Sequence, residues 1–392
     1  MTEIKPVIVA VGYNRPDSLK RLLISLNQAV YPSEDITLIV SIDRSDIWEE
    51  VQKAAESAGW KHGTLDIRVA PERLGLRKHI LKCGDLSQEY GAAIILEDDL
   101  IVARNFYTYV QQALSFYEND PKTAGISLYS HAWNEHMDFH FMPQQNGYDT
   151  YFGQFSCTWG QCWSKDQWTA FKNWYLEHED KLTVNPAIPA DIEQWGDRSW
   201  GKYFVYYLVE TGRYYVMPYT ALSTNCSEIG EHNGHVNATY QVMLMECDHK
   251  EYRFPVYQEA VKYDIFFERV FDPAVTLFSI STDDICVNLN GSHRDTMNKP
   301  YLLTSVKDDR FRLIRSFGMQ LRPIEQNILK DIPGNSLYLY QIPSDMKNVQ
   351  LDVKQNVSDA RGEYESYNFG WKRALKYSRS DFIRMIKGII EG

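Results

Sequence analysis

Strand-like and helix-like patterns of apolar residues alternate along the first 130 residues of the chain. The strand-like runs lie at residues 6–11 (PVIVAV), 36–42 (ITLIVSI), 65–70 (LDIRVA) and 92–96 (AAIIL). Amphipathic stretches between these runs predict helices at residues 17–29, 46–58 and 76–89. Strands that are apolar throughout are buried on both faces. The alternation therefore predicts an α/β fold in which helices flank a mainly parallel sheet.

The pattern changes further along the chain. Residues 125–250 are rich in tryptophan and mixed in pattern, with an isolated strand predicted at 125–129. From about residue 250, short strand-like runs such as 336–342 (SLYLYQI) are separated by Pro, Gly and Asn, which predicts a small β-rich appendage. We therefore expect a first domain over 1–250, a mixed, β-rich region over 251–365 and a terminal helix over 366–392.

The last segment is basic and amphipathic. Residues 370–392 hold six Lys and Arg residues against Asp381 and Glu391, a net charge of +4, while the rest of the chain carries −15. Its apolar residues fall along one helical side, a pattern typical of a helix that lies on a membrane surface. A helix that docks on its own domain with a solvated basic face explains the same pattern equally well.

Composition narrows the classes of partner. The formal net charge is −11, and no basic stretch dominates the first 360 residues, so the chain lacks the footprint of a nucleic-acid binder. Aromatic residues make up 14% of the chain, which mildly favours a carbohydrate ligand. The six cysteines are scattered, as expected of reduced thiols. With no signal-peptide pattern and no apolar run long enough to span a membrane, we expect a cytoplasmic protein.

Charged residues follow the ends of three predicted strands. Arg15 follows the first, Asp43 the second, and Glu97, Asp98 and Asp99 follow the run AAIIL. Because ligands of such sheets bind outside the carboxyl ends of the strands, we expect these side chains to converge on one crevice. Three adjacent carboxylates repel one another, and a divalent cation that bridges a diphosphate would relieve that repulsion. The alternative is a solvated acidic turn, as we predict for Asp283 and Asp284.

Four motifs in this order resemble GT-A-fold nucleotide-sugar glycosyltransferases. They are VIVAVGYNRP at 7–16, SID at 41–43, GLRKH at 75–79 and IILEDDLIVARNFYTY at 94–109. The chain is similar to bacterial family-2-type enzymes and to the N-acetylglucosaminyltransferase I type, which carries a Glu-Asp-Asp form of the DXD motif. Weaker similarity continues through SHAWN (130–134), WGDRSW (195–200) and GEHNGH (230–235). The resemblance implies a Rossmann-like GT-A domain.

The resemblance also implies roles in binding a nucleotide sugar. Tyr13 and Arg15 would lie against the diphosphate or base, Asp43 would accept from the base N–H, and His79 would lie beside the uracil or ribose. Arg77 and Lys78 are further phosphate contacts. Within the triplet, Glu97 would line the donor site and Asp98 would lie near the ribose. Asp99 would ligate Mn²⁺ or Mg²⁺ together with His235, for which His232 is the alternative.

A catalytic base and an acceptor site follow from the same resemblance. The Trp-flanked acidic stretch matches WGDRSW, so Asp197 is the candidate base, with Glu193 and Asp191 as rivals because Gly196 interrupts the usual pair. The alternative role for Asp197 is a cap on the helix that begins near Ser199. The candidate acceptor platforms are Trp133, Trp159, Trp163 and Trp195, each of which could equally be core, and Gly160 could let the backbone approach the donor sugar.

The resulting hypothesis is a metal-dependent, inverting hexosyl- or N-acetylhexosaminyltransferase. It would move a sugar from a nucleoside diphosphate, favoured as UDP, to a carbohydrate or lipid-linked saccharide in surface polysaccharide biosynthesis. One alternative is a sugar-nucleotide nucleotidyltransferase, which would carry a glycine-rich loop that GYNRP lacks. Another is a non-catalytic carbohydrate-binding protein on a degenerate transferase fold. The motifs GxxxxGK[ST], GxSxG and HExxH are absent, which excludes P-loop kinases, serine hydrolases and zinc hydrolases that depend on them.

Overall fold

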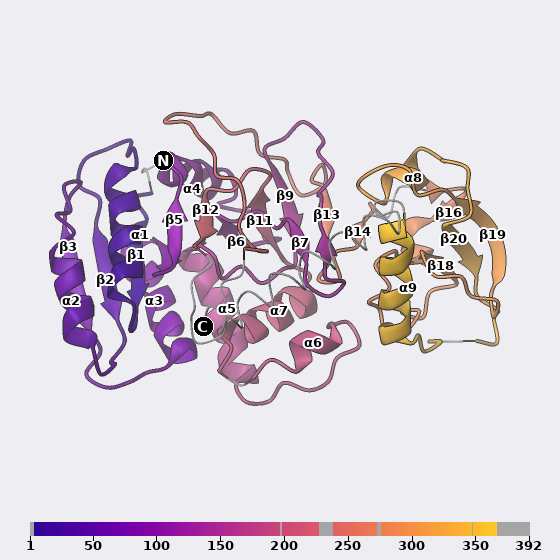
Figure 1. The fold of residues 1–392 in the computed structure, drawn as a ribbon, viewed down its shortest axis with the longest axis horizontal. Helices are drawn as coiled ribbons and strands as arrows, with labels where there is room; N and C mark the ends of the chain where they lie inside the picture. The colour runs from indigo at the N-terminus through magenta and orange to yellow at the C-terminus, as the bar shows by residue number, and fades with distance from the viewer. Residues whose placement is uncertain (1–3, 197, 227–237, 273–275, 347, 367–392) are drawn as a thin grey trace, which may run out of the picture. The chain divides into compact units, whose positions relative to one another are not determined.

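A mixed ten-stranded sheet organises the first part of the molecule (Figure 1). The computed structural model describes residues 4–196, 198–226, 238–272, 276–346 and 348–366. These divide into two compact units, the first over 1–134 and 140–270 and the second over 135–139 and 271–392. The strand order of the large sheet, which belongs to the first unit, is β14-β13-β9-β11-β6-β10-β4-β1-β2-β3.

The parallel half of this sheet comes from the predicted apolar runs. Its strands are β1 (Val7–Gly12), β2 (Leu38–Ile42), β3 (Leu65–Val69) and β4 (Ala92–Glu97). The helices between them are α1 (Pro16–Gln28), α2 (Trp48–Glu56) and α3 (Leu76–Tyr90). Each neighbouring pair in the order β4-β1-β2-β3 is parallel. The predicted α/β fold with helices flanking the sheet is confirmed.

The other half of the sheet mixes strand directions. Its strands are β6 (Thr123–Ser127), β9 (Thr150–Gly153), β10 (Gln161–Ser164), β11 (Tyr214–Pro218), β13 (Lys262–Tyr263) and β14 (Arg269–Val270). Its helices are α4 (Phe106–Phe116), α5 (Lys165–His178), α6 (Ala190–Glu193) and α7 (Trp200–Thr211). β10 lies antiparallel between β4 and β6. Residues 262–270, which the sequence assigned to the C-terminal region, add β13 and β14 to the large sheet.

Both faces of the sheet are buried. Ile8 and Ala10 of β1 pack with α1, α2 and α4, whereas Val7, Val9 and Val11 pack with α3, α5 and α7. Side chains alternate along a strand, so a run such as VIVAV must have an apolar layer on each side. Two short pairs complete the unit: β5 (Leu100–Val102) with β12 (Ser223–Asn225), and β7 (Trp133–Asn134) with β8 (Phe139–His140).

The second unit confirms the predicted β-rich C-terminal region. Its sheet has the order β17-β18-β20-β19. Its elements are β15 (Thr276–Leu277), β16 (Ile280–Ser281), the 3₁₀ turn Thr282–Asp284, β17 (Ile285–Asn288), β18 (Tyr301–Thr304), β19 (Arg312–Phe317), α8 (Gln326–Leu329), β20 (Leu337–Gln341) and α9 (Val353–Ser366). The predicted terminal helix at 370–392 lies outside the described residues. No helix in the described ranges is long and apolar enough to cross a membrane.

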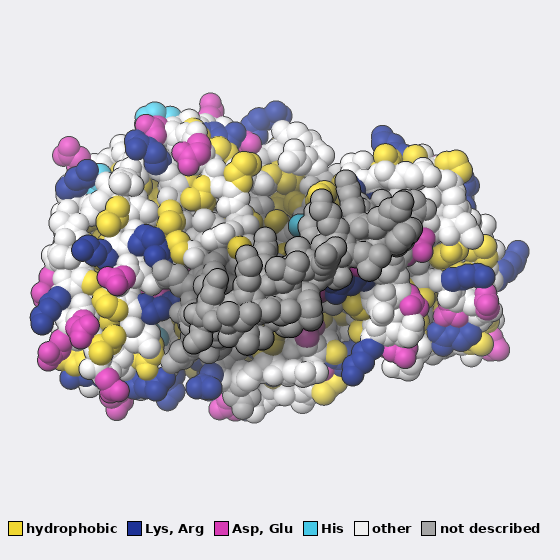
Figure 2. All heavy atoms as spheres, in the orientation of Figure 1, with side chains coloured by type: hydrophobic (Ala, Val, Ile, Leu, Met, Phe, Trp, Pro, Cys, Tyr) yellow, Lys and Arg dark blue, Asp and Glu magenta, His cyan; other side chains and the backbone are white. Residues whose placement is uncertain are grey.

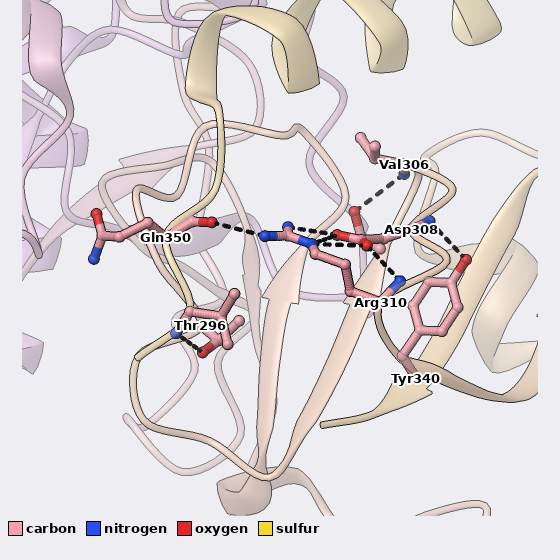
Figure 3. Close-up of polar contacts among 8 residues, drawn as sticks. Thr296, Val306, Asp308, Arg310, Tyr340 and Gln350 are labelled. Carbon is pink, nitrogen blue, oxygen red and sulfur yellow. Dashed lines mark hydrogen bonds and ion pairs between the residues drawn. The ribbon is translucent and has the colours of Figure 1, made fainter. Parts of the chain in front are cut away.

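Side-chain contacts fasten the loop between β18 and β19 (Figure 3). Arg310 donates to the Asp308 carboxylate, with 3.0 Å from Nε to Oδ1, and to the Gln350 carbonyl at 3.4 Å. The Asp308 backbone N–H donates to the Tyr340 hydroxyl at 3.1 Å. On the face drawn in Figure 2, Lys and Arg are interspersed with Asp and Glu, with no continuous basic field.

Close packing of α3 on α5 depends on Gly84. A Cβ at this position would lie 2.3 Å from ring carbons of Trp168, which is fully buried and donates its indole N–H to Asp85 at 2.8 Å. Gly→Ala inside a helix ordinarily stabilises the helix by about 1 kcal/mol, but here the rigid indole has no room to move.

We expect Gly84→Ala to lower the free energy of unfolding by about 1–3 kcal/mol, because overpacking outweighs the gain in helix propensity. Urea denaturation followed by circular dichroism measures the change. Gly362→Ala in α9 is the matched control, since nothing lies within 4 Å of its added Cβ, and it should be neutral or slightly stabilising. A Gly84→Ala variant as stable as the wild type would contradict the close packing.

Candidate active site

A cluster of one arginine and three carboxylates lies at the carboxyl ends of β1 and β4. These strands are parallel neighbours, with Val11 opposite Glu97, so the residues that follow them meet. Arg15 donates from Nη2 to Asp98 and from Nη1 to Asp99, the latter over 3.4 Å. The structure therefore brings together Arg15 and the triplet that the sequence placed in one crevice.

Negative charge in this cluster is only partly compensated. Burial raises the pKa of Glu97 to about 8, and the neighbouring Asp99 and Asp98 add to the increase, while Arg15 opposes it. Burial also raises the pKa of Asp98 to about 6, despite the opposing effect of Arg15. One guanidinium faces three carboxyl groups, so the site favours an added proton or cation.

The donor set fits a cation that is shared with a phosphate. Among the described residues no three His, Cys, Asp or Glu side chains are arranged to hold a metal ion by themselves. Mg²⁺ and related ions, however, are commonly bound by one or two carboxylates together with substrate phosphates, and carboxylate oxygens suit Mg²⁺ and Mn²⁺. Asp99 keeps a partly exposed side chain, at 28%, and could serve in this way.

The predicted histidine ligands cannot be placed. His235 and the alternative His232 lie outside the described residues. The chain reaches that segment beside the triplet, because β12 pairs with β5 and the Cys226 N–H donates to the Asp99 carbonyl at 3.0 Å.

Asp43 is committed to backbone contacts. It is buried, and its carboxylate accepts from the N–H groups of Leu74 at 2.7 Å, Gly75 at 2.9 Å and Arg44 at 2.9 Å. Gly75 has a φ of 76°, a left-handed conformation that suits glycine. Asp43 therefore fixes the turn that begins α3, a contact that the sequence did not predict, and the role in accepting a base N–H remains a prediction.

His79 lies next to this turn, in a pocket of about 200 Å³. Its Nε2 and the Ser41 hydroxyl are 2.7 Å apart. Burial lowers the pKa of His79 to about 4, with Asp43 opposing the shift and Lys82 adding to it, so the ring is neutral at pH 7. A neutral imidazole paired with a hydroxyl lines the pocket without adding charge.

The remaining cations lie in different surroundings. Arg77 donates from Nη1 to the Tyr203 hydroxyl at 2.9 Å and to Asp180 at 3.2 Å, which links α3 to the connection after α5 and to α7. Lys78 is exposed. Arg73, which sequence reasoning missed, holds its guanidinium 5.1 Å from the centre of the Tyr13 ring. No motif drew attention to Arg73, since it precedes GLRKH.

The predicted acidic stretch surrounds the start of α7. Asp197 itself lies outside the described residues. Ser199 is the N-cap of α7, its hydroxyl accepting from the Lys202 N–H at 3.2 Å. The Lys202 ammonium donates to the carbonyls of Glu193 at 2.9 Å and Trp195 at 3.0 Å. Asp191 is exposed on α6, and the Glu193 carboxylate accepts from the Asn185 N–H at 2.8 Å.

The candidate acceptor tryptophans are partly buried. Trp159 stacks on Tyr240 with 5.1 Å between ring centres and also contacts Tyr129 at 4.7 Å. Trp133 meets His140 edge-on at 5.1 Å, and Trp195 packs against the small apolar cluster beneath α6. Trp163 is fully buried, which favours its alternative role as core. Gly160 has a φ of 100°, so its conformation requires glycine.

Comparisons with known proteins give weak likenesses only. Neither protein-family models nor curated protein sequences match this chain. Among solved structures, the mannosyltransferase PcManGT from Pyrobaculum calidifontis in complex with GDP-Man and Mn²⁺ is 14% identical, with 43% of this chain covering 46% of that one at a TM-score of 0.30. S. aureus TarS 1–349 in complex with UDP is 14% identical, with coverages of 56% and 59% and a TM-score of 0.34.

A third match is GalNAc-T7 with UDP, GalNAc and Mn²⁺, which is 13% identical, with coverages of 56% and 43% and a TM-score of 0.37. The chain thus spans about half the length of the solved structures it matches. At TM-scores below 0.5, the case for a function comes from the site's own geometry.

The raised pKa of Glu97 predicts a pH dependence of stability. The fold favours the protonated carboxyl, so this contribution is present below the usual pKa near 4.5 and is lost as the pH rises through about 8. In metal-free protein, we expect Glu97→Gln to reduce the fall in unfolding free energy between about pH 5 and pH 8.5 by on the order of 1–2 kcal/mol.

Urea denaturation in the presence of a chelator measures this difference. Glu118→Gln, at an exposed position, is the control and should leave the pH dependence unchanged. Identical pH profiles for the wild type and Glu97→Gln would show that Glu97 does not carry the destabilising charge.

Proposed function

We propose that this chain transfers a sugar from a nucleoside diphosphate donor to a saccharide acceptor. The observation that carries the proposal is the excess negative charge at the ends of β1 and β4, where Glu97, Asp98 and Asp99 face the single guanidinium of Arg15. A diphosphate that arrives with a divalent cation would supply the missing positive charge and would place its own oxygens beside Arg15.

The donor would bind across the strand ends. Asp99 would hold Mn²⁺ or Mg²⁺, with His235 or His232 as a second ligand, and the bound cation would neutralise charge that develops on the leaving diphosphate. Arg15 would release part of its contact with Asp98 and Asp99 to bind phosphate. The base, which we propose to be uracil, would lie near Tyr13 and the pocket beside Ser41 and His79, while the turn fixed by Asp43 sets its shape.

The chemical step would be a single displacement with inversion. The acceptor oxygen forms a bond to the anomeric carbon while the bond from that carbon to the diphosphate oxygen breaks, and the acceptor proton passes to a carboxylate. We assign that carboxylate to Asp197. Ser199 supplies the cap of α7, so Asp197 is not needed for it, and the Glu193 carboxylate already accepts from a backbone N–H.

The setting follows from the same assignment. We propose a hexosyl- or N-acetylhexosaminyltransferase that acts in the cytoplasm on a carbohydrate or lipid-linked saccharide, in the biosynthesis of a surface polysaccharide. Trp133, Trp159 and Trp195 are the proposed acceptor contacts. Residues 370–392, outside the described part of the chain, would touch the inner face of the membrane through their basic amphipathic pattern.

The first prediction concerns the cation. In a thermal-shift screen of UDP-, GDP-, CMP- and dTDP-sugars, at least one donor should stabilise the wild type only with Mn²⁺, by about 2.7 kcal/mol at 100 times its Kd. Asp99→Asn keeps the size of the side chain but loses its charge, and it should abolish that shift without changing the melting temperature of the ligand-free protein by more than a few degrees.

Asp284→Asn is the matched control, because Asp284 is an exposed carboxylate in the turn Thr282–Asp284 of the second unit. It should bind the donor as the wild type does. An undiminished Mn²⁺-dependent shift in Asp99→Asn would remove Asp99 from the site.

The second prediction concerns the base. Asp197→Asn should lower kcat by roughly 10²-fold or more with donor Kd nearly unchanged, because the amide preserves shape but accepts no proton. Turnover is measured as release of the nucleoside diphosphate, and the anomeric configuration of the product, expected to be inverted, by NMR. Near-full turnover in Asp197→Asn together with inactive Glu193→Gln or Asp191→Asn would move the role to the rival carboxylate. Retention of configuration would refute the single displacement.

A further inference from the structure

Gln161 lies at the start of β10, beside the carboxyl end of β4. It pairs in register with Ile95 on one side and Ser127 on the other. Ile95 and Trp163 both pack on the face that α3, α5 and α7 cover, so Gln161, which lies opposite Ile95 and two residues before Trp163, points to the same face. Sequence reasoning singled out Gly160 and the tryptophans but not this glutamine.

The amide of Gln161 is buried without a hydrogen-bonding partner. The residue has 0% exposure, and neither its Nε2 nor its Oε1 is paired among the described residues. The neighbouring Ser127 hydroxyl is already used by the Tyr129 carbonyl at 2.8 Å. An amide buried in this way destabilises the fold, whereas a leucine of similar size would not.

The carboxylate cluster begins on this same face. Glu97 follows Ile95 by two residues on β4, so its side chain also points toward α3, diagonally across from Gln161. Diagonal neighbours of this kind are about 7–8 Å apart, within reach of a shared small ligand. Trp159, which precedes Gln161 by two residues, is partly exposed. A buried amide beside an aromatic ring and a carboxylate is a suitable combination for a polyol.

We propose that Gln161 recognises the sugar ring of the nucleotide sugar, with its amide hydrogen-bonding to two neighbouring polar substituents of the ring. This inference rests on the proposed function and adds a specificity-determining residue to it. An amide carries one acceptor oxygen and two N–H donors, so it matches a pair of hydroxyls, or a hydroxyl and an acetamido group, better than a phosphate. Because Gln161 is fully buried, the contact forms only after the side chains above it move aside.

The test is Gln161→Leu. The variant should melt about 2–6 °C higher than the wild type, because it removes a buried polar group that has no partner. Its affinity for a nucleotide sugar should fall about tenfold or more, while its affinity for the corresponding nucleoside diphosphate stays within about twofold. The probes are UDP-glucose, UDP-galactose, UDP-N-acetylglucosamine and UDP-N-acetylgalactosamine against UDP, and GDP-mannose against GDP, all with Mn²⁺ and measured by calorimetry.

Gln154→Leu is the matched control. Gln154 is also a buried glutamine of the large sheet, but its Nε2 donates to the carbonyls of Leu208 and Arg213, each at 3.2 Å. This variant should melt lower than the wild type, and it should leave the ratio of nucleotide-sugar to nucleotide affinity unchanged.

Each outcome decides the proposal. A lower melting temperature for Gln161→Leu would make the amide a structural group and overturn the inference. A higher melting temperature with unchanged sugar affinity would overturn the sugar contact alone. Equal losses for the nucleotide sugar and the nucleotide would also overturn it. A wild type that binds neither probe would remove the proposed function, and this inference with it.

Discussion

Repulsion among the carboxyl groups of Glu97, Asp98 and Asp99 is the constraint on which the site depends. The three follow a strand that is buried on both faces, so they cannot all turn to water. Arg15 takes up part of the charge because β1 and β4 are parallel neighbours whose ends meet. What remains unbalanced makes this edge of the sheet receptive to a cation and an anion that arrive together.

The surrounding contacts stabilise that edge while leaving it receptive. Asp43, a fourth carboxylate at the strand ends, is held by three backbone N–H groups and fixes the turn before α3. His79 is neutral and paired with Ser41, so it does not compensate the charge of the triplet. The cations closest in sequence, Arg77 among them, are engaged elsewhere. Arg15 is thus the cation whose described contacts reach the triplet.

Much of this arrangement could be predicted from sequence, for a physical reason. Runs such as PVIVAV and AAIIL are apolar on both faces, which only a covered parallel sheet satisfies, and the residues after such runs must share an edge. The position of β10 could not be predicted, because QCWS is a short segment whose partners are 65 or more residues from some strands and its direction is set by tertiary packing. The commitments of Asp43 and Arg77 were equally hidden, since a carboxylate or guanidinium at a strand end reads alike whether it faces a ligand or a backbone turn.

The place of β10 also bears on how the chain assembles. β1 to β4 are joined by successive crossover helices and need only residues up to 97, whereas the outer edge of β4 is completed by a strand that begins at Gln161. Closing so long an intervening segment is entropically slower than forming the local units. A nascent or truncated chain that ends before residue 161 would carry the acidic edge intact but would leave β4 as an unpaired, wholly apolar strand, a template for association with other chains. Completion of the binding edge and protection from aggregation are therefore the same folding event.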